Sequence, residues 1–199
     1  MITSIKVFKE VFKPHNLAAR QQELREQTIK MLGQEVVDGD LIVEPWVLEL
    51  NFDKIRIKHI KGDLDIHNLK LNEIPEWISL IKIDGDFDCS INNLLDLKNS
   101  PKTLLGSFYC NTNTLTSLKG CTKMIGKSFV CRNNKLTSLE GGPEWVGNDY
   151  ICSENNLKSV NGIADKINGD FICKNNSIKL FKNDIYSYIT KVGGDIILK

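Results

Sequence analysis

Two aspartates and a histidine are spaced so that they could share one small acidic site. Asp65 and His67 alternate along one short segment, and Asp88 holds the equivalent position 23 residues later. If the two segments are neighbouring strands, the three side chains lie within roughly 7 Å of one another. Carboxylates this close together favour a divalent cation or a basic partner, and an imidazole beside them can move a proton. The triad is therefore a candidate cation site or acid–base site.

Other aspartates beside this triad have a structural interpretation. Asp63 and Asp86 belong to a position that recurs along the chain as aspartate or serine. The other members of the column are Asp40, Ser107, Ser128, Asp149, Asp170 and Asp195. Aspartate and serine after a bend hydrogen-bond the local backbone, so we expect this column to support turns. Only Asp65, Asp88 and His67 then remain as functional candidates in this region.

Recognisable catalytic motifs are missing from the chain. The histidines are His15, His59 and His67, and none has the spacing of a His-Glu-x-x-His zinc site. There is also no glycine-rich phosphate loop and no Gly-x-Ser-x-Gly elbow. We therefore expect a non-catalytic protein without a cofactor or a resident metal, with activity at the acidic triad as the alternative.

The triad lies next to a sequence repeat that must position it. Five cysteines are spaced 21 residues apart, and an asparagine follows each of them three residues later. The cysteines are Cys89, Cys110, Cys131, Cys152 and Cys173, and the asparagines are Asn92, Asn113, Asn134, Asn155 and Asn176. A fixed period of about 20 to 29 residues is typical of a solenoid, whose units bury a shared core against their neighbours.

Each unit reads aromatic-x-Cys-x-x-Asn-x-Leu-x-x-Leu, with small variations. The aromatic residue and the cysteine alternate with outward residues, as in a short strand with one buried face. Stacked about 4.8 Å apart, such strands form a parallel sheet along one side of the molecule. Apolar residues such as Ile83 and Leu104 close the preceding loop. The asparagines then form a ladder that satisfies backbone groups at the bend.

Degenerate units extend the repeat toward both ends. Val43, Ile66 and Leu198 take the cysteine position, which gives about eight coils over residues 39–199. We therefore divide the chain into a solenoid domain, 39–199, and an N-terminal helical cap or docking segment, 1–38. The expected fold class is an α/β-type solenoid, mostly strands and irregular coils, with a parallel sheet on one side.

The N-terminal segment carries two helical patterns. Apolar residues recur at helical spacing before Pro14, and Asn16 can cap a second helix that runs to Gly33. The first pattern consists of Ile5, Phe8, Val11 and Phe12. We expect these helices either to cover the open end of the first coil or to dock against a partner or a membrane surface. A third helical pattern at residues 185–192 predicts a C-terminal capping turn.

The repeat resembles the short leucine-rich repeat of bacterial and bacteriophage proteins, with phenylalanine and cysteine in place of two strand leucines. The resemblance covers residues 39–199, and the five central units carry it. It implies either a factor that engages a host protein or a virion component anchored by its N-terminal helices. The corresponding locations are the cytoplasm of the host and the virion.

The composition argues against several partners and locations. The formal net charge is +1, which gives no bulk attraction to nucleic acid or to an anionic membrane. No apolar run is long enough to span a bilayer, and charges interrupt the first residues where a signal peptide would be apolar. We expect a cytoplasmic protein that is monomeric or part of an assembly.

The cysteines are expected to be reduced core residues. Cysteine behaves as a small hydrophobic side chain, and a position facing the core between aromatic columns suits it. The repeat lacks the Cys-x-x-Cys pairs of zinc sites, and Cys121 lies outside the register. A metal column and disulfides are the alternatives.

The outward positions of the expected sheet form a second candidate surface. Before the later cysteines stand the apolar residues Tyr109, Val130, Ile151 and Ile172. Polar and charged residues flank this stripe at Asn111, Arg132, Glu154 and Lys174. An apolar stripe with a polar rim is typical of a protein-binding patch, although β propensity alone also explains branched residues on an exposed strand. We expect a partner protein to bind here.

Overall fold

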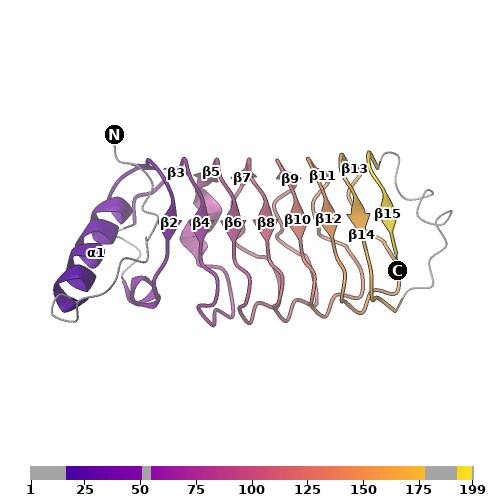
Figure 1. Cartoon of the computed structure of the whole chain (residues 1–199), viewed down its shortest axis with the longest axis horizontal. Coiled ribbons are helices and arrows are strands. Elements are labelled where there is room, and N and C mark those ends of the chain that lie inside the picture. The colour runs from indigo at the N-terminus through magenta and orange to yellow at the C-terminus, as the bar shows by residue number, and fades with distance from the viewer. Residues whose placement is uncertain (1–16, 51–54, 178–191, 199) are drawn as a thin grey trace.

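The chain winds into a parallel β-solenoid. The structure, a computed structural model, describes residues 17–50, 55–177 and 192–198. Successive coils stack along one axis, so that each strand pairs in parallel with the same strand of the next coil (Figure 1). The expected solenoid with an N-terminal helical cap is therefore confirmed.

One side of the solenoid is an eight-stranded sheet, built from the strands that the repeat predicts. Each strand has two residues, of which the first is buried in the core and the second faces outward. In spatial order the strands are β2 Leu41–Ile42, β4 Leu64–Asp65, β6 Phe87–Asp88, β8 Phe108–Tyr109, β10 Phe129–Val130, β12 Tyr150–Ile151, β14 Phe171–Ile172 and β15 Ile196–Ile197. Like residues are therefore aligned from coil to coil.

A second, seven-stranded parallel sheet lies elsewhere on the coils. Its strands are β1 Val36–Val37, β3 His59–Ile60, β5 Lys82–Ile83, β7 Thr103–Leu104, β9 Met124–Ile125, β11 Trp145–Val146 and β13 Lys166–Ile167. The sequence analysis assigned Ile83 and Leu104 to loops, whereas each is the buried residue of a strand. The outward residues of these strands, such as Lys82 and Thr103, share no type from coil to coil, so the repeat does not mark them as strands. Because β1 belongs to this sheet, the first coil includes residues before Gly39.

The N-terminal helix α1, Leu17–Leu32, stands at the end of the solenoid beside β2 (Figure 1). Its last turn packs on the core through Leu32, which is buried, and the guanidinium of Arg25 lies 5.5 Å from the ring centroid of Trp46. Short 3-10 turns occur at η2, Pro45–Glu49, and η4, Glu76–Leu80. The predicted helix at residues 5–12 and most of the predicted C-terminal turn lie outside the described residues.

An aromatic column runs through the core along the solenoid axis. Its rings belong to Phe87, Phe108, Phe129, Tyr150 and Phe171. Neighbouring ring centroids are 5.0 to 5.7 Å apart and tilted or edge-on, which is a favourable aromatic geometry. The six cysteines are free thiols, and all of them are buried. Burial raises the pKa of the Cys89, Cys110 and Cys131 thiols, so these side chains behave as apolar core groups.

The asparagine column forms a ladder of hydrogen bonds between coils. In its central rung, the Oδ1 atom of Asn134 accepts the backbone N–H of Leu115 at 3.0 Å. The Nδ2 atom of Asn134 donates to the carbonyl oxygens of Cys110 and Cys131, at 3.0 and 3.1 Å. Each asparagine thus satisfies the backbone of its own coil and of the preceding one at the bend where the sheet ends.

The aspartate column forms a second ladder. Oδ1 of Asp149 accepts the backbone N–H of Asp170 at 2.9 Å, and Oδ1 of Asp170 accepts the N–H of Asp195 at 2.8 Å. The same bond joins Asp40 to Asp63 and Asp63 to Asp86. The sequence predicts that these aspartates bond the backbone of their own turn. Each of them instead accepts an N–H of the next coil, because stacking brings equivalent residues together across the sheet.

Candidate functional site

The outward side chains of the eight-stranded sheet form one continuous column. The register aligns Ile42, Asp65, Asp88, Tyr109, Val130, Ile151, Ile172 and Ile197. The column is acidic at its second and third positions and apolar from Tyr109 onward. Both candidate surfaces from the sequence, the acidic triad and the apolar stripe, therefore lie on the same face.

A shallow depression of about 220 Å³ opens at the acidic end of this face. Its acidic lining consists of Asp40, Asp63, Asp65, Asp86 and Asp88. Ile42, Leu64 and Tyr109 supply apolar surface, and Leu64 is fully buried. Lys127 provides one counter-charge, since its Nζ lies 3.8 Å from Oδ1 of Asp86. Five carboxylates thus surround one opening, which we call the acidic depression.

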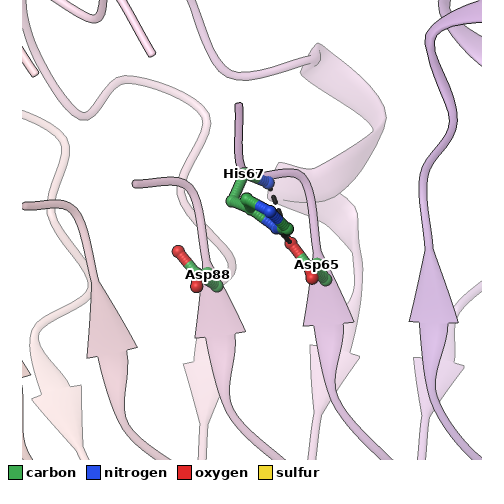
Figure 2. Close-up of side chains that lie close together, drawn as sticks. All are labelled: Asp65, His67 and Asp88. Carbon is green, nitrogen blue, oxygen red and sulfur yellow. Dashed lines mark hydrogen bonds and ion pairs between the residues drawn. The ribbon is translucent and has the colours of Figure 1, made fainter. Parts of the chain in front are cut away.

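The predicted triad is brought together at one side of this depression. Figure 2 shows His67 in the turn after β4, with its ring directed toward Asp65, and Asp88 on the neighbouring strand. The Nδ1 atom of His67 lies 2.6 Å from Oδ1 of Asp65, and this oxygen also accepts the backbone N–H of His67 at 2.9 Å. One ligand atom from each of the three side chains lies within 4.8 Å of the others.

Electrostatics around His67 favour its charged form. The hydrogen bond that the imidazole makes to the carboxylate of Asp65 is the largest influence and raises the pKa of His67. Burial opposes it, and the negative charges of Asp65 and Asp88 add smaller effects that raise the pKa further. The carboxylate of Asp88 accepts the backbone N–H of Ser90 at 2.8 Å. Both aspartates are therefore held in fixed orientations by the backbone, as side chains in such turns commonly are.

The triad has the chemistry of a cation ligand set. Two carboxylates and an imidazole at this separation could contact one divalent ion, with water completing its shell. The rest of the depression's lining adds the carboxylates of Asp40, Asp63 and Asp86 and the phenol of Tyr109, which are groups that acid–base chemistry also uses.

The apolar stripe continues beyond the four residues that the sequence predicts. Tyr109, Ile151 and Ile172 are half-buried, and Val130 between them is only 9% exposed. Ile197 extends the column by one coil, because β15 pairs with β14. Ile197 is not among the four stripe residues predicted from the sequence, although it directly precedes Leu198 at the cysteine position of the last coil.

The predicted rim residues lie on one side of the stripe. Arg132 and Lys174 follow their cysteines and are exposed, and Asn111 in the same position is half-buried. Glu154 lies one residue further on, at a turn position where the backbone has a φ of +57°. Its side chain is exposed, so it borders the stripe at a greater distance than the other three.

Comparison with protein-family models, with curated proteins and with solved structures found no match to this chain. Among the helices that the structure describes, none is long and apolar enough to cross a lipid bilayer. Arguments about function therefore rest on the surface that the coils build.

Proposed function

We propose that the protein is a non-catalytic protein-interaction module that binds a partner protein on the outward face of its eight-stranded sheet. The observation that carries this proposal is the apolar column from Tyr109 to Ile197. Four strand spacings of about 4.8 Å give this column a length of about 19 Å. A flat apolar strip of this length, rimmed by charged residues, suits the core of a protein interface.

The rigidity of the face supports the same function. Ladders of hydrogen bonds fix the strands at both of their ends. After the strand, Asn134 bonds the preceding coil, and before the strand, Asp149 bonds the following one. A preorganised surface loses little conformational entropy on binding, so that its apolar area contributes to affinity. The resemblance to short leucine-rich repeats favours a phage or bacterial factor that engages a host protein in the cytoplasm.

The test is affinity capture from the native or infected-cell lysate, with the intact protein beside three variants. In the face variant, Tyr109 and Ile151 are both replaced by alanine. A matched control, Met124→Ala, removes an exposed apolar side chain from the seven-stranded sheet. We expect the face variant to lose the partner and the control to keep it. Retention of the partner by a folded face variant would remove this face from consideration.

A second candidate function is a structural or assembly component, of the virion type, anchored by its N-terminal helices. The observation in its favour is that α1 exposes Leu24 and Ile29, which are 42% and 51% accessible. Apolar side chains on a helix surface are available to a partner's groove. The third variant, deletion of residues 1–13, removes the first predicted helix and leaves α1 in place. Loss of the partner from this deletion alone would make the solenoid a scaffold.

Cation binding at Asp65, Asp88 and His67 stays a prediction from the sequence. Its test is calorimetry of the intact protein with calcium, magnesium, manganese and zinc chlorides, beside the Asp65→Asn/Asp88→Asn variant. Bound ion would raise the melting temperature of the wild type and not of the variant. An absence of heat and of stabilisation with all four ions would exclude the site.

A further inference from the structure

The outward face of the eight-stranded sheet is acidic, although the whole chain has a formal net charge of +1. Its two aspartate columns contain Asp40, Asp63, Asp65, Asp86, Asp88, Asp149, Asp170 and Asp195. Opposing cations are few: Arg132 and Lys174 on the rim, Lys127 beside Asp86, and His67 in its charged form. A surface with this excess of carboxylates repels acidic partners and attracts basic ones.

The ladder bonds orient these carboxylates without neutralising them. A backbone N–H is a dipole, so Asp149 and Asp170 keep their negative charge while they bond the next coil. The charges are also fixed in position, because both ends of each bond belong to the rigid stack. A partner therefore meets a preorganised row of negative charge beside the apolar column.

Tyr109 joins the acidic depression to the apolar stripe. It lines the depression, and it is also the first apolar residue of the column. A lysine or arginine side chain that enters the depression can lay its aliphatic stem against Tyr109 and place its charged head among the carboxylates. The depression is shallow and open, as suits the end of one side chain rather than a whole small molecule.

We propose that the partner presents a basic, amphipathic protein segment to this face. One or more lysine or arginine side chains occupy the acidic depression, and apolar side chains of the same segment cover Val130, Ile151 and Ile172. This inference rests on the proposed function and names the chemistry of the partner. Three strand spacings separate Asp88 from Ile151, which puts the cationic group about 14 Å from the middle of the apolar contact.

The test is selection of a displayed library of random 16-residue peptides on the intact protein. Affinities of the selected peptides are then measured, at low and high salt, for four proteins: the wild type, Asp65→Asn/Asp88→Asn, Tyr109→Ala/Ile151→Ala and the control Met124→Ala. Asparagine keeps a side-chain oxygen that can accept the N–H of His67 at position 65 and the N–H of Ser90 at position 88. The Asp65→Asn/Asp88→Asn variant should therefore stay folded. Circular dichroism and thermal unfolding check each variant.

We expect selected peptides to combine lysine or arginine with apolar residues. The Asp65→Asn/Asp88→Asn variant should bind them at least tenfold more weakly than the wild type does. Added salt should reduce this difference in affinity between the two proteins. Two results would overturn this inference and leave the proposed function standing. In the first, the peptides need Tyr109 and Ile151 but lack a cationic residue. In the second, they need Tyr109 and Ile151 but bind the Asp65→Asn/Asp88→Asn variant as well as the wild type. A selection that yields no peptide dependent on either pair of residues would contradict both.

Discussion

The carboxylate of Asp149 lies directly against Gly169 of the next coil. A Cβ atom added to that glycine would be 2.3 Å from Oδ1 of Asp149, closer than any real contact. The same pairing joins Asp40 to Gly62 and Asp63 to Gly85. Where serine replaces the aspartate, at Ser107 and Ser128, the next coil carries Lys127 and Asn148 in place of glycine. From Asp40 to Asp170, each aspartate of this ladder is thus matched by a glycine one coil later, where backbone atoms of the preceding coil also crowd a Cβ atom.

The first prediction tests this steric pairing. Gly169→Ala should lower the free energy of unfolding by about 1 to 3 kcal/mol, because the new methyl group collides with the carboxylate of Asp149. In an Asp149→Ser background the same substitution should cost at least about 1 kcal/mol less, since serine leaves room for a side chain. Urea unfolding of the four proteins in this cycle measures the coupling. Equal costs in both backgrounds would show that backbone contacts alone exclude a side chain at Gly169.

A second prediction concerns the asparagine ladder. Asn134→Ala should destabilise the protein by about 1 to 3 kcal/mol, because it leaves the buried N–H of Leu115 without its partner and removes one of the two asparagine donors to the carbonyl of Cys110. The matched control is Asn156→Ala, which removes an exposed asparagine in the next coil and should change stability by less than about 0.5 kcal/mol. Similar unfolding midpoints for both variants in urea would contradict a structural role of the ladder.

A third prediction follows from the hydroxyl group of Tyr150. It is buried in the aromatic column, and its Oη has no hydrogen-bond partner among the described residues. Tyr150→Phe should therefore leave stability unchanged or raise it by up to about 1 kcal/mol. The reverse change, Phe129→Tyr, should cost about 1 to 3 kcal/mol, because it buries a new unpaired hydroxyl. A marked loss in Tyr150→Phe, measured by thermal unfolding, would mean that the hydroxyl is hydrogen-bonded.

A fourth prediction concerns a strained backbone position. Ile91 has a φ of +55° and its side chain is 49% exposed, whereas the equivalent Asn133 and Asn175 have a residue type that tolerates this conformation. Ile91→Asn should stabilise the protein by about 0.5 to 1 kcal/mol, because the left-handed region costs a branched residue most. Asn175→Ile, the opposite change, should destabilise it by a similar amount. Calorimetry measures the melting temperatures. A lower value for Ile91→Asn together with a higher value for Asn175→Ile would show that the backbone at Ile91 is not strained.

A fifth prediction concerns pH. The pKa of His67 is raised above its ordinary value of 6.5, chiefly by the hydrogen bond from Asp65. The pair therefore contributes stability that is fully present below pH 6.5, the unfolded value, and that is lost as pH rises through the higher folded value. NMR titration of the imidazole should give a midpoint above 6.5 in the wild type and a lower one in Asp65→Asn. Identical midpoints would show that Asp65 does not hold the imidazole in solution.

The repeat carries most of the fold because its signals are redundant. Cys131, Asn134 and Leu136 mark one coil, and the same three types recur in the same order in three others, while the last regular unit has Ile178 in place of leucine. A parallel stack then places equivalent residues beside one another, so the closeness of Asp65 and Asp88 also follows from the spacing.

Other features had no signal of this kind. The seven-stranded sheet has outward residues as different as Lys82, Met124 and Trp145, so nothing in its composition repeats. The acidic depression depends on how the five aspartate side chains are oriented around one opening. The spacing of residues in the sequence does not predict these orientations. By contrast, Ile197 could have been predicted, because Leu198 at the cysteine position puts Ile197 in register with Ile172.

The dependence of each glycine on the aspartate one coil earlier also limits how this gene can grow or shrink. Duplication or loss of a 21-residue stretch keeps every aspartate matched to its glycine when the join falls between a glycine and the residue after it, as between Gly106 and Ser107. If the join fell one residue earlier, Lys127 could take the place of Gly106, one coil after Asp86, where a Cβ atom has no room. A repeat unit that preserves this pairing is thus offset from the visible coil, and each copy gained or lost changes the length of the outward face of the eight-stranded sheet by about 4.8 Å.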